Sequence, residues 1–414
     1  MIDIARNTNR GEVVDTSAYS FANTEKIRRL HKSLNAYNVT PLVELKTFAR
    51  EKNVAAVFVK DESKRFGLKA FKALGSVWAI YKVISDAIKL DNPTLDEIFQ
   101  RRDELSEMTF ATTTDGNHGK GVSWAARFFG CKSRVFMPKG TVEVRAQAIR
   151  DAGSATVEIT DMTYDDCVKF TAQLAEQNHW QLIQDTAWDG YEDIPAQIML
   201  GYSTLAYEAI EQMNHLATFE QKNVERRDAA ITSDCRNSQS RQPGQASRLP
   251  THIFLQAGVG SMAAAVAAVF AENFPDNPPR VTIVEPTQVA CFYESFKIGD
   301  GLIHSATGNG QTMMAGLNCA TPCSVAWKIL RRLATDAATI SDSVAAEAMR
   351  VLSAQGIISG ESGCAGFALV NAAVNSPELR RALDIDEHSR IFVINTEGDT
   401  DPANYVKVLH EDST

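Results

Sequence analysis

Residues 55–75 read AAVFVKDESKRFGLKAFKALG, and they join an apolar run at 55–60 to a helix that we expect at 71–90. Short apolar runs bounded by polar residues are typical of strands that are buried on both faces. The same order of short apolar run and longer amphipathic stretch recurs along most of the chain. This alternation predicts an α/β fold in which parallel, twisted sheets are covered by helices.

The expected elements cover most of the sequence. Strands are predicted at 55–60, 108–112, 134–137, 156–159, 182–185, 252–255, 281–284 and 391–394. Helices are predicted at 71–90, 142–151, 164–178, 194–215, 343–354 and 363–375. A chain of 414 residues exceeds the ~250 residues at which single domains usually stop growing. We therefore expect two domains.

Composition and charge exclude several classes of function. The net charge of −9 argues against general binding of nucleic acid, which needs a basic face. The longest apolar run, 263–271, is shorter than a membrane span, and residues 1–7 lack the apolar stretch of a secretory signal. Cys319 and Cys323 have no neighbouring histidine or further cysteine to complete a metal site. The seven cysteines form no disulfide framework, so we expect a cytoplasmic protein with no metal, membrane or nucleic-acid partner.

One segment differs from the rest of the chain. Residues 217–249 are polar and irregular, with the sequence DCRNSQSRQPGQ at their centre. Such a composition buries little apolar surface, and we therefore predict a flexible surface insertion. The alternative is a functional lid or partner-binding loop.

Three stretches carry residues suited to chemistry. Lys72 lies among apolar neighbours, and burial would lower the pKa of its amine and make it nucleophilic. Residues 113–119, TTDGNHG, follow a predicted strand and offer hydroxyls, a carboxylate and an amide. Residues 258–261, GVGS, follow another strand, where glycines let backbone N–H groups and a helix N-terminus approach a phosphate. In this order they indicate an enzyme that holds pyridoxal 5'-phosphate on its lysine.

Each stretch also has a purely structural interpretation. A glycine turn before a helix often serves packing alone, and a lysine on an amphipathic helix is normally exposed. Asp115 or Asn117 could cap the helix that follows, and Thr396 could cap the end of its strand. A helix cap explains one polar residue of the turn, but it does not explain the whole set.

Several motifs resemble the fold-type-II pyridoxal-phosphate enzymes, such as threonine and serine dehydratases, cysteine synthase and the tryptophan synthase β-subunit. The shared motifs are TPL at 40–42, FKALG at 71–75, DGNHG at 115–119 and GVG at 258–260. Within this group the chain is most similar to the 2,3-diaminopropionate ammonia-lyases. That similarity is carried by TDGNHG at 114–119, QDTAWDGY at 184–191, MAGL at 314–317, SGESG at 359–363 and TEGDTD at 396–401. Ser76 departs from the second glycine that is common in the family.

The resemblance implies an architecture and roles for individual residues. It implies a large cofactor-binding domain at 1–77 and 195–414, a smaller mobile substrate-side domain at 78–194, and a homodimer. The implied cofactor-binding residues are Lys72, Asn117, Gly258, Val259, Gly260, Ser261 and Thr396. The implied substrate-binding residues are Thr114, Asp115, His118 and Asp185, and the implied catalytic residues are Lys72 and Asp115.

The acidic residues of this chain distinguish between the activities that are found in the family. The hydroxy-amino-acid dehydratases usually have serine or alanine at the position of Asp115, whereas this chain has carboxylates at Asp115 and Asp185. Two acidic groups suit a substrate with an additional ammonium group. We therefore expect elimination from D- and L-2,3-diaminopropionate to give pyruvate and two molecules of ammonia. The alternatives are a serine or threonine dehydratase and a pyridoxal-phosphate-binding protein without catalysis.

Overall fold

The computed structural model describes residues 2–232 and 248–410 and contains two sheets. The larger sheet has the strand order β1-β10-β9-β8-β11-β3-β2 and the smaller one β6-β5-β4-β7. The larger sheet is built from β1 (Ile4–Arg6), β2 (Leu42–Glu44), β3 (Ala56–Asp61), β8 (His252–Gln256), β9 (Arg280–Pro286), β10 (Ala334–Ile340) and β11 (Arg390–Asn395). The smaller sheet is built from β4 (Thr109–Thr113), β5 (Lys132–Met137), β6 (Thr156–Ile159) and β7 (Gln181–Leu182).

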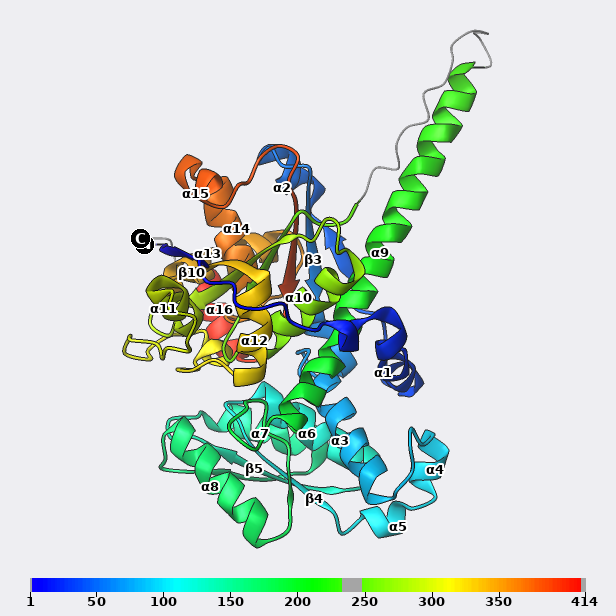
Figure 1. Ribbon diagram of the computed structural model, residues 1–414, viewed down its shortest axis with the longest axis vertical. Helices are drawn as coiled ribbons and strands as arrows, with labels where there is room; N and C mark the ends of the chain where they lie inside the picture. Colours follow the sequence, from blue (N-terminus) through cyan, green and yellow to red (C-terminus); the bar gives the residue numbers. More distant parts are fainter. Residues whose placement is uncertain (1, 233–247, 411–414) are drawn as a thin grey trace.

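Helices surround both sheets (Figure 1). Helices of the first half are α1 (Phe21–Ser33), α2 (Lys46–Glu51), α3 (Ala73–Ala87), α4 (Leu95–Phe99), α5 (Arg102–Leu105), α6 (Asn117–Phe129), α7 (Glu143–Gly153), α8 (Tyr164–Gln177) and α9 (Asp193–Thr232). Those of the second half are α10 (Ser261–Asn273), α11 (Cys291–Ile298), α12 (Ser324–Leu333), α13 (Asp342–Ala354), α14 (Ala365–Val374), α15 (Pro377–Ala382) and α16 (Pro402–His410). Short 3₁₀ turns are η1 (Ser17–Tyr19), η2 (Glu62–Gly67) and η3 (Ala315–Leu317).

The predicted α/β class is confirmed, with one correction at the sheet edges. All pairings of the smaller sheet are parallel, and β10, β9, β8, β11 and β3 are parallel in the larger sheet. The outer strands β1 and β2 are antiparallel to their neighbours. Antiparallel edge strands on a mainly parallel sheet are common, because an edge strand needs no crossover helix.

Both faces of the larger sheet are buried, as its apolar strands predict. Successive residues of a strand point to opposite faces. Accordingly, Phe58 packs in the core shared with α3, α9 and α10, whereas Val57 and Val59 pack in the core shared with α13 and α14. All of β3 is buried. Burial on both faces explains why this strand reads as an unbroken apolar run.

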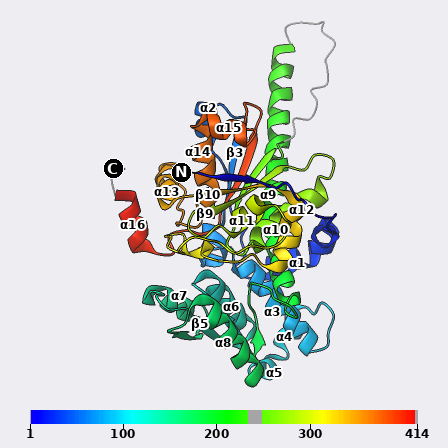
Figure 2. The same cartoon turned by 60° about the vertical axis from the view of Figure 1, so that its left-hand side comes forward.

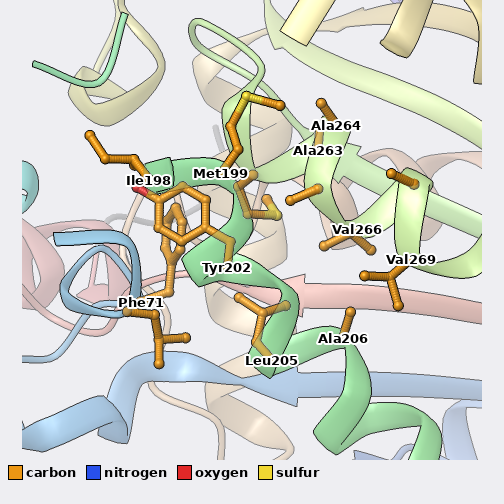
Figure 3. Packing of buried hydrophobic residues seen from close by; sticks show 14 of the residues in the cluster. Phe71, Ile198, Met199, Tyr202, Leu205, Ala206, Ala263, Ala264, Val266 and Val269 are labelled. Atoms are coloured by element: carbon orange, nitrogen blue, oxygen red, sulfur yellow. The ribbon is translucent and has the colours of Figure 1, made fainter. Parts of the chain in front are cut away.

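Helix α9 connects the two halves of the molecule. It packs against α3 on one side and α10 on the other. Its Tyr202 ring lies 4.8 Å, centroid to centroid, from the ring of Phe71, directly before Lys72 (Figure 3). The other end of α9 extends beyond the body of the protein in both ribbon views (Figures 1 and 2).

The prediction of an irregular insertion at 217–249 is wrong for the first part of this segment, because helix α9 continues without interruption to Thr232. The sequence from 217 to 232 is polar, but it is rich in Glu, Gln, Lys, Arg and Ala, which have high helix propensity. Polarity alone therefore did not indicate a loop. Residues 233–247 of this segment lie outside the described residues.

The predicted strand at 182–185 is also shorter than expected, since β7 comprises only Gln181 and Leu182. The Gln184 side chain explains the early end of the strand. The backbone N–H of Thr113 in β4 donates to Gln184 Oε1 at 2.9 Å. A side-chain oxygen thus takes the place that a backbone carbonyl oxygen would have if β7 continued beside β4. This change releases the residues after Gln184 from the sheet.

The sheets agree in extent with the two expected domains. Every strand of the smaller sheet lies within residues 78–194, and every strand of the larger sheet lies outside this range. The domain boundaries and the mobility of the smaller domain stay predictions. Among the residues that the structure describes, no helix is both long and apolar enough to cross a membrane.

Candidate active site

A cavity of about 260 Å³ lies between the carboxyl ends of the strands of both sheets. The smaller sheet contributes residues that follow β4, β5 and β7, and the larger sheet contributes residues that follow β8 and β11. Ligands of parallel α/β proteins bind at this end of the strands. All eleven residues that were predicted to form the site line this cavity: Lys72, Thr114, Asp115, Asn117, His118, Asp185, Gly258, Val259, Gly260, Ser261 and Thr396.

Lys72 precedes helix α3 and extends its side chain into the cavity. Its Nζ donates to Asp185 Oδ2 at 2.7 Å, and its side chain is 21 % exposed. Burial by itself would lower the pKa of the amine, but the Asp185 carboxylate outweighs this effect and raises the pKa above its usual value. The expected lowered pKa is therefore wrong for this arrangement, because the sequence did not show that a carboxylate pairs with the lysine.

Asp185 lies after β7 and faces two partners. Burial alone would raise the pKa of this carboxyl group, but His118, in the protonated form that it takes in acid, and the Lys72 ammonium lower it to about 2. His118 Nε2 donates to the carbonyl oxygen of Ile183 at 2.7 Å, so Nδ1 is the unprotonated nitrogen of the neutral ring. Nδ1 lies 3.8 Å from Asp185 Oδ2, and it has no hydrogen-bond partner within the described part of the chain. These two groups offer acceptors to a cationic ligand.

Asp115 lies in the turn between β4 and α6. Burial raises the pKa of its carboxyl group, and Arg145 and Lys72 oppose that shift. The Arg145 guanidinium also contacts the backbone carbonyl oxygen of Asp115 at 3.5 Å. A buried carboxylate with a raised pKa accepts a proton more readily than an exposed one.

The same turn is held by Thr114. Its Oγ1 accepts hydrogen bonds from the backbone N–H groups of Gly116 at 2.9 Å and Gly119 at 3.1 Å. This hydroxyl therefore stabilises the turn that presents Asp115 and Asn117, in addition to lining the cavity. The Asn117 amide donates to the Glu397 carboxylate, which directly follows Thr396.

The glycine loop at 258–261 lies between β8 and α10 and has little free space. A Cβ atom on Gly258 would lie 2.9 Å from Cys319 Sγ, and one on Gly260 would lie 2.4 Å from Cζ of Phe292. Gly260 also has a φ of +94°, which side chains rarely adopt. The loop thus exposes backbone N–H groups at the start of α10, which is an arrangement that binds phosphate.

Thr396 follows β11, which is the neighbour of β8 in the larger sheet, and also lines the cavity. Its Oγ1 accepts a hydrogen bond from Gln256 Nε2 at 3.1 Å, so the hydroxyl proton remains free to donate elsewhere. The two N–H donors of Gln256 Nε2 are shared among Thr396 and the carbonyl oxygens of Gly363 and Ile394, and each of these carbonyl oxygens lies 2.9 Å from this nitrogen. These bonds hold the threonine side chain in place.

Other residues also line the cavity, and among those with polar side chains sequence reasoning missed Arg145, Tyr164, Gln256 and Glu397. Gln256 directly precedes the glycine loop, and Glu397 belongs to the TEGDTD motif, so both had a signal in the sequence. Arg145 and Tyr164 lie at the starts of the amphipathic helices α7 and α8, where such residues are normally exposed. Their positions follow only from the way the helices pack.

Comparison with known proteins agrees with this site. A family model described as pyridoxal-phosphate dependent enzyme matches residues 34–222 and 242–397. The chain belongs to this family of pyridoxal-phosphate dependent enzymes. Within described residues no group of three or more His, Cys, Asp or Glu side chains is arranged to hold a metal ion.

Similar proteins point to a particular group within the family. The chain is 40 % identical to a diaminopropionate ammonia-lyase of Escherichia coli strain K12, covering 99 % of this chain and 96 % of that protein. A crystal structure of the Escherichia coli enzyme with an aminoacrylate–pyridoxal-phosphate azomethine reaction intermediate superimposes with a TM-score of 0.84 at 39 % identity, covering 99 % and 97 % of the chains. The same enzyme in complex with D-serine gives a TM-score of 0.84 at 38 % identity and the same coverage.

The residues of the cavity fit pyridoxal 5'-phosphate. The cofactor needs an amine, a phosphate site and partners for its ring, and the cavity provides a lysine, a glycine loop and the Asn117 and Thr396 side chains. Any side chain larger than hydrogen at Gly258 or Gly260 would occupy the space beside the loop backbone. The donor set and the shape of the loop therefore both suit this cofactor.

Proposed function

We propose that this protein is a diaminopropionate ammonia-lyase that acts on both D- and L-2,3-diaminopropionate. Each turnover consumes one water and gives pyruvate and two molecules of ammonia. Full-length similarity to the Escherichia coli enzyme supports the proposal. The observation that carries it is the pair of carboxylates, the partly buried Asp115 and the buried Asp185, in the cavity that contains Lys72.

The charges of the cavity favour a diamino substrate. In the absence of a ligand, the Lys72 ammonium neutralises Asp185 at 2.7 Å. Once Lys72 is bound to the cofactor, Asp185 and the open Nδ1 of His118 can accept hydrogen bonds from the second ammonium group of the substrate. A hydroxyl group in its place offers no charge, and opposite charges attract strongly in a site of low dielectric constant.

Four groups would hold the cofactor. Lys72 would bind its aldehyde carbon, the loop 258–261 its phosphate, Asn117 its ring oxygen and Thr396 its ring nitrogen. When bound, pyridoxal phosphate supplies a conjugated ring that stabilises the electron pair left after an α-proton is removed. Thr396 is a neutral partner, which cannot keep the ring nitrogen protonated as a carboxylate would.

The proton transfers are assigned to Lys72 and Asp115. Lys72 Nζ, once its bond to the cofactor has been exchanged for a bond from the substrate α-amine, would take the α-proton of one enantiomer, and an oxygen of Asp115 would take the α-proton of the other. The raised pKa of Asp115 suits this role, because a more basic carboxylate is a better proton acceptor. Two bases allow one site to use both enantiomers.

Side-by-side turnover tests the proposal. Pyruvate release is measured with D- and L-2,3-diaminopropionate and with D- and L-serine, at equal concentrations of cofactor-loaded enzyme. We expect the highest kcat/KM for the diamine. A higher kcat/KM for serine would instead identify a serine dehydratase. Full cofactor loading without any turnover would identify a binding protein.

We further propose a homodimer in the cytoplasm, on the basis of the family resemblance. Light scattering on the cofactor-loaded protein measures the assembly directly. A mass near twice 45.4 kDa supports a dimer, and a mass near 45.4 kDa contradicts it.

A further inference from the structure

The Glu397 carboxylate occupies a position where both halves of the cavity meet. One oxygen, Oε2, accepts a hydrogen bond from Asn117 Nδ2 at the start of α6. The other, Oε1, accepts from the backbone N–H of Ser362 at 3.2 Å. Glu397 therefore joins a side chain from the smaller sheet to the backbone of the larger half.

The contact between Asn117 and Glu397 determines which way the Asn117 amide group faces. An asparagine NH₂ group has two donors, and its oxygen is an acceptor. Glu397 uses one donor and repels the amide oxygen, so it excludes the flipped orientation of Asn117. The second N–H donor is then available to the ring oxygen of the cofactor.

The surroundings hold Glu397 itself in place. Its side chain is buried, and Gly360 N–H donates to its backbone carbonyl oxygen at 3.0 Å. A single β-bridge pairs Glu397 with Ala70, two residues before Lys72. The Phe71 N–H also donates to the Thr396 carbonyl oxygen at 3.2 Å. The segment that carries Glu397 is thus fixed relative to the lysine.

Positive charges balance the carboxylate. Lys120 is partly buried, and burial lowers the pKa of its amine to about 8, although neighbouring Glu397 opposes this shift. Lys120 Nζ donates to the carbonyl oxygen of Leu68 at 3.0 Å, on the segment that leads to Lys72. Burial and the neighbouring Glu361 carboxylate raise the pKa of Glu397, whereas Arg145, the Asn117 amide and Lys120 oppose this shift and favour the ionised form. The carboxylate is therefore part of a prepared charge arrangement and not an isolated buried acid.

We propose that Glu397 is a positioning residue, which sets the orientation of the Asn117 amide toward the cofactor. In this proposal Glu397 acts on the cofactor through Asn117. The inference rests on the proposed role of Asn117 in cofactor binding, and it is independent of which amino acid is the substrate.

A double-mutant cycle on cofactor binding tests this proposal. The variants are N117A, E397A and N117A/E397A, and E397Q is added as the conservative change. The dissociation constant of pyridoxal 5'-phosphate is measured by titration, and the absorbance of the bound cofactor is followed with pH. We expect E397A to weaken binding about tenfold when Asn117 is present and less than about twofold when it is absent. E397Q keeps an acceptor oxygen for Asn117 and should lose about threefold or less.

A nearby carboxylate provides the matched control. Asp399 pairs with Lys69 at 2.8 Å at a partly exposed position, so D399N should leave the dissociation constant unchanged. An equal loss for E397A in both backgrounds would show that Glu397 does not act through Asn117 and would overturn the inference. An unchanged dissociation constant in N117A would overturn it as well. If E397A does not fold, the same cycle is run with E397L, which keeps a buried side chain and removes the acceptor, and the same two outcomes decide. Diamine turnover by the unmodified enzyme tests the proposed function separately.

Discussion

The charges of the Lys72–Asp185 ion pair depend on which ligand the site contains. In the cavity without a ligand, the 2.7 Å contact keeps both groups charged, since the pKa of the lysine is raised and that of the aspartate is lowered. A covalent bond between Lys72 and the cofactor would remove the lysine ammonium from this pair. Asp185 would then be a buried carboxylate without a cationic partner. Under the proposed function a substrate ammonium would take the place of the lysine, and the same carboxylate would serve both states.

At this scale, replacing Lys72 is the most direct test of the site. We expect K72A to lose at least about 1000-fold in turnover, because it removes both the covalent attachment of the cofactor and a proton acceptor. The visible absorbance of the bound cofactor should change at the same time. Borohydride treatment followed by mass spectrometry should find the cofactor on Lys72 of the unmodified protein.

Lys82 offers a matched control on α3, the helix that follows Lys72, because its ammonium pairs with Asp86 at 3.8 Å and does not line the cavity. K82A should retain both turnover and absorbance. Retention of both in K72A would show that another group holds the cofactor.

Asp115 has a separate signature, which depends on the enantiomer and on pH. D115N should reduce kcat/KM for D-2,3-diaminopropionate by about 100-fold or more, with a much smaller loss for the L-isomer. The base is the ionised form, and burial raises its pKa. Activity on the D-isomer should therefore fall with decreasing pH at a value above the ~3.9 of an ordinary aspartate. Pyruvate release as a function of pH measures both effects, and equal losses for the two isomers would exclude Asp115 as the second base.

At the scale of elements, the glycine loop before α10 can be tested by adding one carbon atom. In G260A, the Cβ atom would lie 2.4 Å from Phe292, and φ would have to stay near +94°. We expect at least a tenfold loss of affinity for pyridoxal 5'-phosphate, because the loop must move to relieve the clash. The dissociation constant is measured by titration.

The matched control for G260A is Gly356, after α13. Gly356 also has a positive φ, +77°, but nothing lies within 4 Å of an added Cβ atom. G356A therefore carries the backbone strain without the clash, far from the cavity. It should lower the unfolding midpoint and leave the dissociation constant unchanged. Equal affinity in G260A and G356A would show that the loop does not contact the phosphate.

The sequence predicted most accurately those elements whose position depends on one dominant physical cause, such as the burial of a strand on both faces. Strands β3, β8 and β11 are apolar on both faces, and their positions agree with the prediction to within a residue or two. Strand β10 was missed because Ala334–Ile340 consists mainly of Ala and Thr, and alanine has low β propensity. Edge strands of three residues, such as β1, are too short to show a period.

The candidate site shows the same division between what sequence can and cannot predict. Lys72 and the loop 258–261 were found because their local sequence already determines a strand-to-helix turn. The Lys72–Asp185 and Asn117–Glu397 contacts join residues separated by 113 and 280 positions. Such contacts depend on how the two sheets are placed, and no local pattern records that placement.

At the scale of the whole molecule, a buried ionic cluster fixes α9 against the larger sheet. Glu208 on α9 accepts from Lys60 of β3 at 2.7 Å and from Arg65 at 2.8 Å. Arg65 also pairs with Glu62 at 2.8 Å, and both cationic side chains have no exposed surface. The four charges sum to zero. Because η2 connects these residues to the segment of Lys72, the cluster sets the position of the active-site lysine relative to α9.

Replacement of Glu208 tests this cluster. E208Q would leave two buried cations with one carboxylate, and we expect a loss of about 3 kcal/mol in the free energy of unfolding. E25Q is the control, because Glu25 forms an exposed pair with Arg29 on α1 and should change stability by less than about 0.5 kcal/mol. Urea unfolding with equal cofactor saturation measures both, and similar stabilities of E208Q and E25Q would show that the cluster is not stabilising.

The pH dependence of unfolding distinguishes a lost charge from altered packing. The folded-state pKa of Glu208 is lowered to about 2: burial alone would raise it, but Arg65 and Lys60 outweigh that effect. A carboxyl group with a lowered pKa stabilises the fold above its unfolded pKa, about 4.3, and loses this contribution as pH falls toward 2. The unmodified protein should therefore lose stability relative to E208Q over this interval, and the difference between the two should narrow with acid. A constant difference from pH 7 to pH 3 would attribute the effect of E208Q to packing and not to charge.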